Sequence, residues 1–206
     1  MNKIVTDIKP QTKNKKRVNV YLDGEFACGL DLLTVLSNRI KVGMEISGER
    51  LKEIVIESEI RSATDVALTF VSKSPKTKKQ VEDKLKNYNY DKAVIETAIK
   101  KVEEYGYIDD LDYAKRYVST YKNQKGKLLL KCELIKKGVS QDIIESALND
   151  LESQTYEVKR IAEKYLKGKQ IDIKILQKCY KYLLSKGFSY DEVGEVISEI
   201  KSNNLE

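Results

Sequence analysis

The chain has no histidine and no tryptophan, and only two prolines among its 206 residues. Without histidine it cannot form a Ser–His–Asp or Cys–His catalytic system, an HExxH zinc site or a switch based on imidazole titration. The GxxxxGK[ST], GxGxxG, GxSxG and EF-hand patterns are absent as well. We therefore expect a protein that is not an enzyme and that needs no cofactor and no metal ion.

Cysteine is scarce: Cys28, Cys132 and Cys179 lie far apart and form no CxxC pair. An odd count without regular spacing indicates buried thiols in a reducing compartment, with a reactive cysteine as the alternative. No apolar run approaches the ~20 residues of a membrane span, and the first residues contain no apolar core of a signal peptide. The sequence thus predicts a cytoplasmic protein that does not enter a membrane.

The N-terminal region predicts β-structure. Segments 4–8 and 17–22 have the pattern of short strands, and Asp23-Gly24 between two alternating segments is typical of a tight hairpin. A basic run at 13–17 precedes this hairpin. Asp31 is a candidate cap for a short helix that Gly43 closes. Two sets of side chains are each expected to share one face: Val18, Val20 and Leu22, and then Phe26, Cys28 and Leu30.

The rest of the chain contains a threefold internal repeat with a step of 49 residues. The segments LKNYNYDKAVIETAI, LIKKGVSQDIIESAL and LLSKGFSYDEVGEVI begin at Leu85, Leu134 and Leu183. At the same position of each segment there is a residue type that tolerates a left-handed backbone. It is followed in each segment by an apolar residue and then by a helix-capping residue. The aligned positions are Asn89, Gly138 and Gly187, then Tyr90, Val139 and Phe188, then Asp91, Ser140 and Ser189.

Each repeat is predicted as helix, loop, helix, tight turn, helix, because ALTFV, AKRYV and AEKYL align upstream of the loops. Repeats of this length stack into arrays. The predicted fold is therefore mainly α: three tandem three-helix repeats forming an elongated curved rod, preceded by a small β-hairpin or three-stranded domain. The expected domains are 1–46, 47–108 with a linking helix and the first repeat, 109–153, and 154–206.

Helix starts and ends mark the joins between repeats. Gly106 is expected to end the last helix of the first repeat, and Asp109 or Asp110 to cap the next helix. Ser153 or Thr155 is expected to cap the first helix of the third repeat, and Ser189 with Glu192 forms a capping-box pattern.

Lysines gather at the first loop of every repeat, so the repeat places them on one edge. Such a stripe, without a base-reading motif, suits the backbone of a nucleic acid, and ordinary solvated loops are the alternative. The tyrosines Tyr117, Tyr121 and Tyr165 could stack on bases, although Tyr117 and Tyr165 align with Phe70 and could belong to the core. The basic candidates are Lys73, Lys76, Lys78, Lys79, Arg116, Lys122, Lys125, Lys127, Lys131, Lys164, Lys167, Lys169 and Lys174.

Two other classes of function remain open. Helix–tight turn–helix around Gly138 or Gly187 is a pattern of duplex-reading regulators, although the helices that would read DNA begin with acidic or neutral turns. A structural scaffold that contacts no nucleic acid is the third possibility.

The segments RVNVYLDGEF, EEYGYIDDLDYAKRYV and LIKKGVSQDII resemble the RecX family, bacterial regulators of the RecA recombinase, and the resemblance covers nearly the whole chain. It implies a modulator that binds RecA, both free and as its filament on single-stranded DNA. It further implies inhibition that tempers recombination and the SOS response. Apart from the resemblance, we expect a monomer, and the basic loops predict weak direct binding of DNA. The family commonly has arginine and serine where SKSPKTKKQ here has lysines and Pro75, which leaves the charge in place but not an arginine-specific contact.

Overall fold

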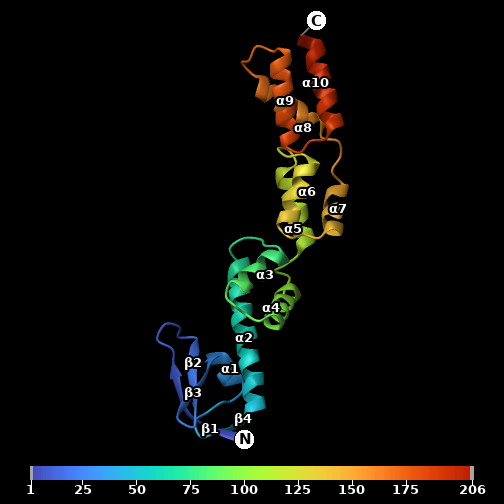
Figure 1. Ribbon diagram of the computed structural model, residues 1–206. Helices are drawn as coiled ribbons and strands as arrows, with labels where there is room; N and C mark the ends of the chain where they lie inside the picture. The colour runs from blue at the N-terminus through green and yellow to red at the C-terminus, as the bar shows by residue number, and fades with distance from the viewer. Residues whose placement is uncertain (1, 205–206) are drawn as a thin grey trace. The chain divides into compact units, whose positions relative to one another are not determined.

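The computed structural model describes residues 2–204, and these form two compact units (Figure 1). One unit comprises the chain up to Lys76 together with Gln80–Ile108, and the other comprises Thr77–Lys79 together with the chain from Asp109 onward. No helix among the described residues is both long enough and apolar enough to cross a membrane.

The first unit begins with a four-stranded antiparallel sheet in the order β3-β2-β1-β4. The strands are β1 (Asn2–Pro10), β2 (Arg17–Leu22), β3 (Glu25–Asp31) and β4 (Glu45–Ser47). Asp23 and Gly24 both have positive φ, which confirms the predicted hairpin turn. The sheet has one strand more than the predicted three, because the start of β1 pairs with β4 while the rest of β1 pairs with β2.

One side chain of the hairpin lies on the unexpected face. Val20 pairs with Cys28 but the next residue, Tyr21, pairs with Phe26, so β3 contains one extra residue at this point. This bulge turns Phe26 away from the core. On the outer face the Phe26 ring packs edge-on against Tyr21, and the residue is 60% exposed. The expectation that Phe26 shares the buried face of Leu30 was therefore wrong.

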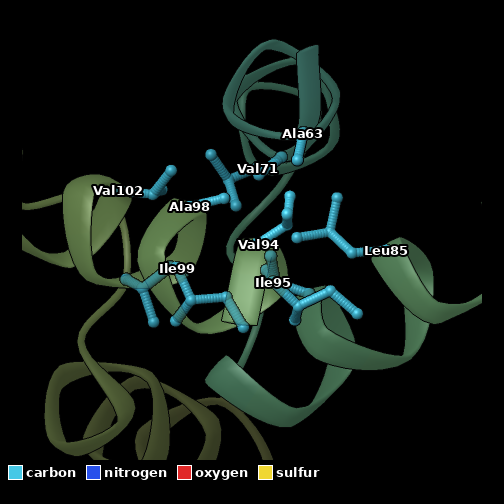
Figure 2. Packing of buried hydrophobic residues seen from close by; sticks show 11 residues of the cluster. Ala63, Val71, Leu85, Val94, Ile95, Ala98, Ile99 and Val102 are labelled. Atoms are coloured by element: carbon cyan, nitrogen blue, oxygen red, sulfur yellow. The ribbon is translucent and has the colours of Figure 1, made fainter. Parts of the chain in front are cut away.

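A single long helix, α2 (Gly48–Val71), connects the sheet to the first repeat and also supplies the first helix of that repeat. Its first half packs Ile54 against the sheet and against α1 (Leu32–Ser37), a helix that Asp31 caps. Its second half joins the core of the first repeat with α3 (Lys78–Lys86) and α4 (Lys92–Glu104). Figure 2 shows Ala63 and Val71 of α2 directed toward Val94 and Ala98 of α4.

The second unit contains two more three-helix repeats, each around its own hydrophobic core. The second repeat has α5 (Asp110–Tyr121), α6 (Lys127–Lys136) and α7 (Gln141–Asn149). The third has α8 (Thr155–Leu166), α9 (Ile173–Ser185) and α10 (Tyr190–Asn204). Asp109 caps α5, and Ser189 and Glu192 form the predicted capping box at the start of α10.

The predicted register of the repeat is confirmed by burial and by backbone conformation. The aligned residues Leu85, Leu134 and Leu183 are all completely buried. The aligned turn residues all have positive φ: 59° at Asn89, 79° at Gly138 and 84° at Gly187.

The three cysteines were expected to be buried, and this is confirmed for only some of them. Cys179 is buried at the repeat position of Leu130, and Cys28 is half-buried, but Cys132 is exposed. Leu130 and Leu134 point into the core from either side of Cys132 along α6, so the residue between them faces outward.

Candidate nucleic-acid interface

The basic residues predicted from the sequence lie in and beside the first loop of each repeat. Lys73 and Lys76 follow α2, Lys122 and Lys125 follow α5, and Lys167 and Lys169 follow α8. The others lie on helices: Lys78 and Lys79 on α3, Arg116 on α5, Lys127 and Lys131 on α6, Lys164 on α8, and Lys174 on α9.

In every repeat, an aromatic ring at the end of the first helix lies beneath a lysine from the first loop. Lys76 lies 5.0 Å from the ring centroid of Phe70, Lys125 lies 5.6 Å from that of Tyr117, and Lys169 lies 3.4 Å from that of Tyr165. All three rings are half-buried against the core of their own repeat. Each ring thus has a core role, and its outer part attracts a cation through the ring quadrupole.

One residue on the second helix of each repeat also contacts this aromatic ring, and its residue type differs among the three repeats. Residues 84, 133 and 182 are related by the same 49-residue step. Lys84 lies over the Phe70 ring at 5.7 Å, whereas Glu133 accepts a hydrogen bond of 2.7 Å from the Tyr117 hydroxyl. Tyr182 stacks on Tyr165 with 4.9 Å between ring centroids. Sequence reasoning missed this position, although the repeat step would have located it.

In the second repeat, Glu133 compensates the charge of the first-loop lysine. Lys125 Nζ donates to both carboxylate oxygens of Glu133, at 2.7 and 2.8 Å. Burial by itself would raise the pKa of Glu133, but the hydrogen bonds from Lys125 and Tyr117 outweigh it and hold that pKa below its usual value. Burial and the bond to Glu133 raise the pKa of Tyr117. Lys125 is therefore bound within the protein and is less available to a phosphate than the sequence suggested.

The remaining candidates differ in how free their charges are. Arg116 forms an ion pair of 2.7 Å with Asp112 one helical turn earlier, an exposed contact that contributes little stability. Lys78 and Lys79 have partners of their own, and Lys131 is half-buried. Seven of the candidate lysines are exposed and form no ion pair with a carboxylate within residues 2–204: Lys73, Lys122, Lys127, Lys164, Lys167, Lys169 and Lys174.

The loop of the second repeat is fixed by a residue that sequence analysis overlooked, Gln154. The side chain is 3% exposed. Its Oε1 accepts from the backbone N–H of Lys127 at 3.0 Å, and its Nε2 donates to the carbonyls of Lys122 and Lys125 at 2.7 and 3.1 Å. Gln154 is also the N-cap residue of α8, so the expectation that Ser153 or Thr155 would cap this helix was wrong.

The tight turn of the third repeat holds the same loop from another side. The backbone N–H of Gly126 donates to the carbonyl of Lys186 at 2.8 Å, and that of Leu128 donates to the carbonyl of Gly187 at 3.1 Å. Because these bonds and those of Gln154 join residues far apart in sequence, the backbone that carries Lys122 and Lys127 is held in one conformation.

Comparison with protein families finds three matching models along the chain. Residues 3–47 match the regulatory protein RecX N-terminal domain. Residues 63–101 match the first three-helix domain of RecX, and residues 109–148 match the second.

Proteins and solved structures that are similar to this chain are also named RecX. The regulatory protein RecX of Clostridium botulinum strain Eklund 17B is 34% identical over 201 residues, which cover 95% of each chain. That of Bacillus subtilis strain 168 is 35% identical over 208 residues, covering 98% of this chain and 79% of the relative. A crystal structure of regulatory protein RecX has a TM-score of 0.72 at 28% identity and covers 96% of this chain and 99% of the other. A second, of RecX from Lactobacillus salivarius, has a TM-score of 0.64 at 32% identity and covers 69% and 97%.

Proposed function

The chain belongs to the RecX family of regulatory proteins, and on that premise we propose that it binds the RecA recombinase and inhibits it. Both free RecA and the RecA filament on single-stranded DNA are the proposed partners. The consequence is reduced recombinase, ATPase and co-protease activity, and hence a weaker recombination and SOS response. The observation that carries this proposal is similarity over 95% of the chain to a protein named as a RecX regulator.

The distribution of charge supports contact with the nucleic acid of the filament. Lys122 and Lys127 of the second repeat and Lys164 and Lys167 of the third are exposed and form no ion pair among the described residues. A phosphate that meets such a lysine releases counterions, and the resulting affinity falls as salt rises. The fixed backbone of the loop at 122–127 lowers the entropy lost when its lysines bind.

Duplex reading by helix-turn-helix units has less support. The helices that would enter a major groove are α4, α7 and α10, and two of them carry acids in the first turn: Asp142 on α7, and Asp191 and Glu192 on α10. Negative charge at that end would face the phosphates of a duplex and weaken binding.

The test measures inhibition of the ATPase of RecA on single-stranded DNA at several salt concentrations. One variant changes Lys122, Lys127, Lys164 and Lys167 to Gln. A matched control removes the same charge outside the first loops, by changing Lys136, Lys178, Lys181 and Lys201 to Gln; all four are exposed.

The native chain and the control are expected to inhibit equally, whereas the first-loop variant requires at least about tenfold more protein and shows a shallower salt dependence. Absence of inhibition by the native chain would refute the proposed function. Equal potency of all three proteins would remove the first-loop lysines from the mechanism.

A further inference from the structure

An open groove of about 590 Å³ lies within the first unit, at the side of α2. Asn14, Lys16 and Arg17 line it from the segment before and at the start of β2, and Tyr88 and Tyr90 line it from the turn between α3 and α4. The volume falls in the range of ~300–1,000 Å³ that is usual for ligand sites.

Basic side chains that form no ion pair line part of this groove. Four of its lining residues are Lys16, Arg17, Lys73 and Lys84, and none of them forms an ion pair with a carboxylate anywhere in residues 2–204. Cations that converge on a concave surface without a carboxylate partner attract an anion, because the nearby protein excludes part of the solvent that would screen them.

The two acidic lining residues differ in their surroundings. Asp31 is 5% exposed, accepts a hydrogen bond from the Leu33 backbone N–H, and lies 3.8 Å from the guanidinium of Arg61. Its charge is therefore compensated within the protein. Asp65, by contrast, is exposed on α2 and reduces the positive potential of the groove.

Aromatic rings form the other part of the lining. Tyr88 and Tyr90 lie nearly parallel, with 6.4 Å between centroids and 18° between ring planes, and Tyr88 is 53% exposed. Lys84 Nζ lies 5.2 Å from the centroid of Tyr88 and 5.7 Å from that of Phe70. The exposed ring of Tyr88 and the ammonium group of Lys84 therefore offer a flat apolar face and a positive charge that one ligand can contact at the same time.

The groove is also partly preorganised. The guanidinium of Arg17 donates to Ser62 Oγ on α2 at 3.0 Å and to the carbonyl of Gly29 at 2.9 Å. These two bonds fix the side chain between the sheet and α2. Since an arginine carries five N–H donors, further donors remain for a ligand.

We propose that this groove binds a segment of single-stranded nucleic acid, with phosphates beside Lys16, Arg17 and Lys84 and a base on the exposed ring of Tyr88. Charge and aromatic surface together favour this ligand class, because a phosphodiester with an unstacked base uses both, whereas an acidic peptide uses only the charge. The inference goes beyond the proposed function, since it concerns the first unit alone and does not require RecA.

The experiment measures binding of a fluorescein-labelled oligothymidylate to the full chain by fluorescence anisotropy, without RecA. Tyr88→Ala is expected to weaken binding about fivefold or more, and Tyr88→Phe to leave it within about twofold, because a phenyl ring still stacks. Lys84→Gln is expected to weaken binding and to lower the slope of log affinity against log salt by about one. Asp65→Asn is expected to tighten binding, a gain that no unfolded variant can produce.

Matched controls are Tyr105→Ala and Lys100→Gln, exposed residues of the same unit that do not line the groove, and both are expected to bind like the native chain. Unchanged affinity in Tyr88→Ala and Lys84→Gln would overturn the assignment. Competition by polyglutamate as strong as by unlabelled oligothymidylate would also overturn it, in favour of an acidic peptide. Loss of RecA inhibition with intact oligonucleotide binding would refute the proposed function and leave the groove supported.

Discussion

Replacement of Gln154 by leucine tests whether the candidate loop is held by the contacts described above. Leucine keeps a comparable side-chain volume but removes three hydrogen bonds, one to the N–H of Lys127 and two to the carbonyls of Lys122 and Lys125. At about 0.5–1.5 kcal/mol net for each bond, the expected loss of unfolding free energy is about 2–4 kcal/mol. For a unit of about 100 residues, this corresponds to a decrease in Tm of about 8 °C or more.

Urea denaturation followed by far-UV circular dichroism measures this loss, with Gln177→Leu as the control. Gln177 is exposed on α9 and forms no hydrogen bond among the described side chains, so its replacement is expected to change stability by less than about 0.5 kcal/mol. A loss below about 1 kcal/mol in Gln154→Leu would show that the loop does not depend on these bonds.

Two further predictions concern the same unit, one on glycines and one on the pH dependence of stability. A Cβ at Gly187 would lie 2.3 Å from Leu129 Cβ, at a backbone φ of +84°, so Gly187→Ala should lower the unfolding free energy by about 2–4 kcal/mol. A Cβ at Gly194 would meet free space, so Gly194→Ala should stabilise its helix slightly. The lowered pKa of Glu133 means that its ion pair with Lys125 stabilises the fold above the unfolded pKa of about 4.3 and is lost as pH falls through the lower folded value. Between about pH 5 and pH 3, the native chain should therefore lose more stability in urea titrations than Glu133→Gln; parallel pH profiles would contradict this.

The parts of the fold that depend on local sequence were predictable. Aligned leucines such as Leu85 and Leu134 are completely buried because one helical face must cover the core of each repeat, and the periodicity records that face directly. The tight turns at Gly138 and Gly187 were predictable for a similar reason, since few residue types tolerate a left-handed backbone.

The parts that depend on partners distant in sequence were not predictable. The outward orientation of Phe26 results from a bulge that only the pairing of β2 with β3 defines. The fourth strand exists because Ile46 meets the start of β1, more than forty residues earlier. The role of Gln154 was not predictable, because a single glutamine between two helices forms no sequence pattern and its hydrogen-bond partners lie in a loop nearly thirty residues away.

The candidate site was predictable in outline only. Clustering of lysines in the first loops is visible in the sequence, but the compensation of Lys125 by Glu133 requires the geometry. The groove of the first unit combines Lys16 and Arg17 with Lys84 and Tyr88, residues that no repeat or motif connects.

Direct binding to RecA is the most immediate test of the proposed function. Immobilised RecA is mixed with the full chain alone, with single-stranded DNA, and with single-stranded DNA and nucleotide, and the retained chain is quantified. Retention by free RecA and by the assembled filament, at levels above a RecA-free matrix carrying the same DNA, is the predicted result. Retention no greater than on that matrix in every condition would contradict the account.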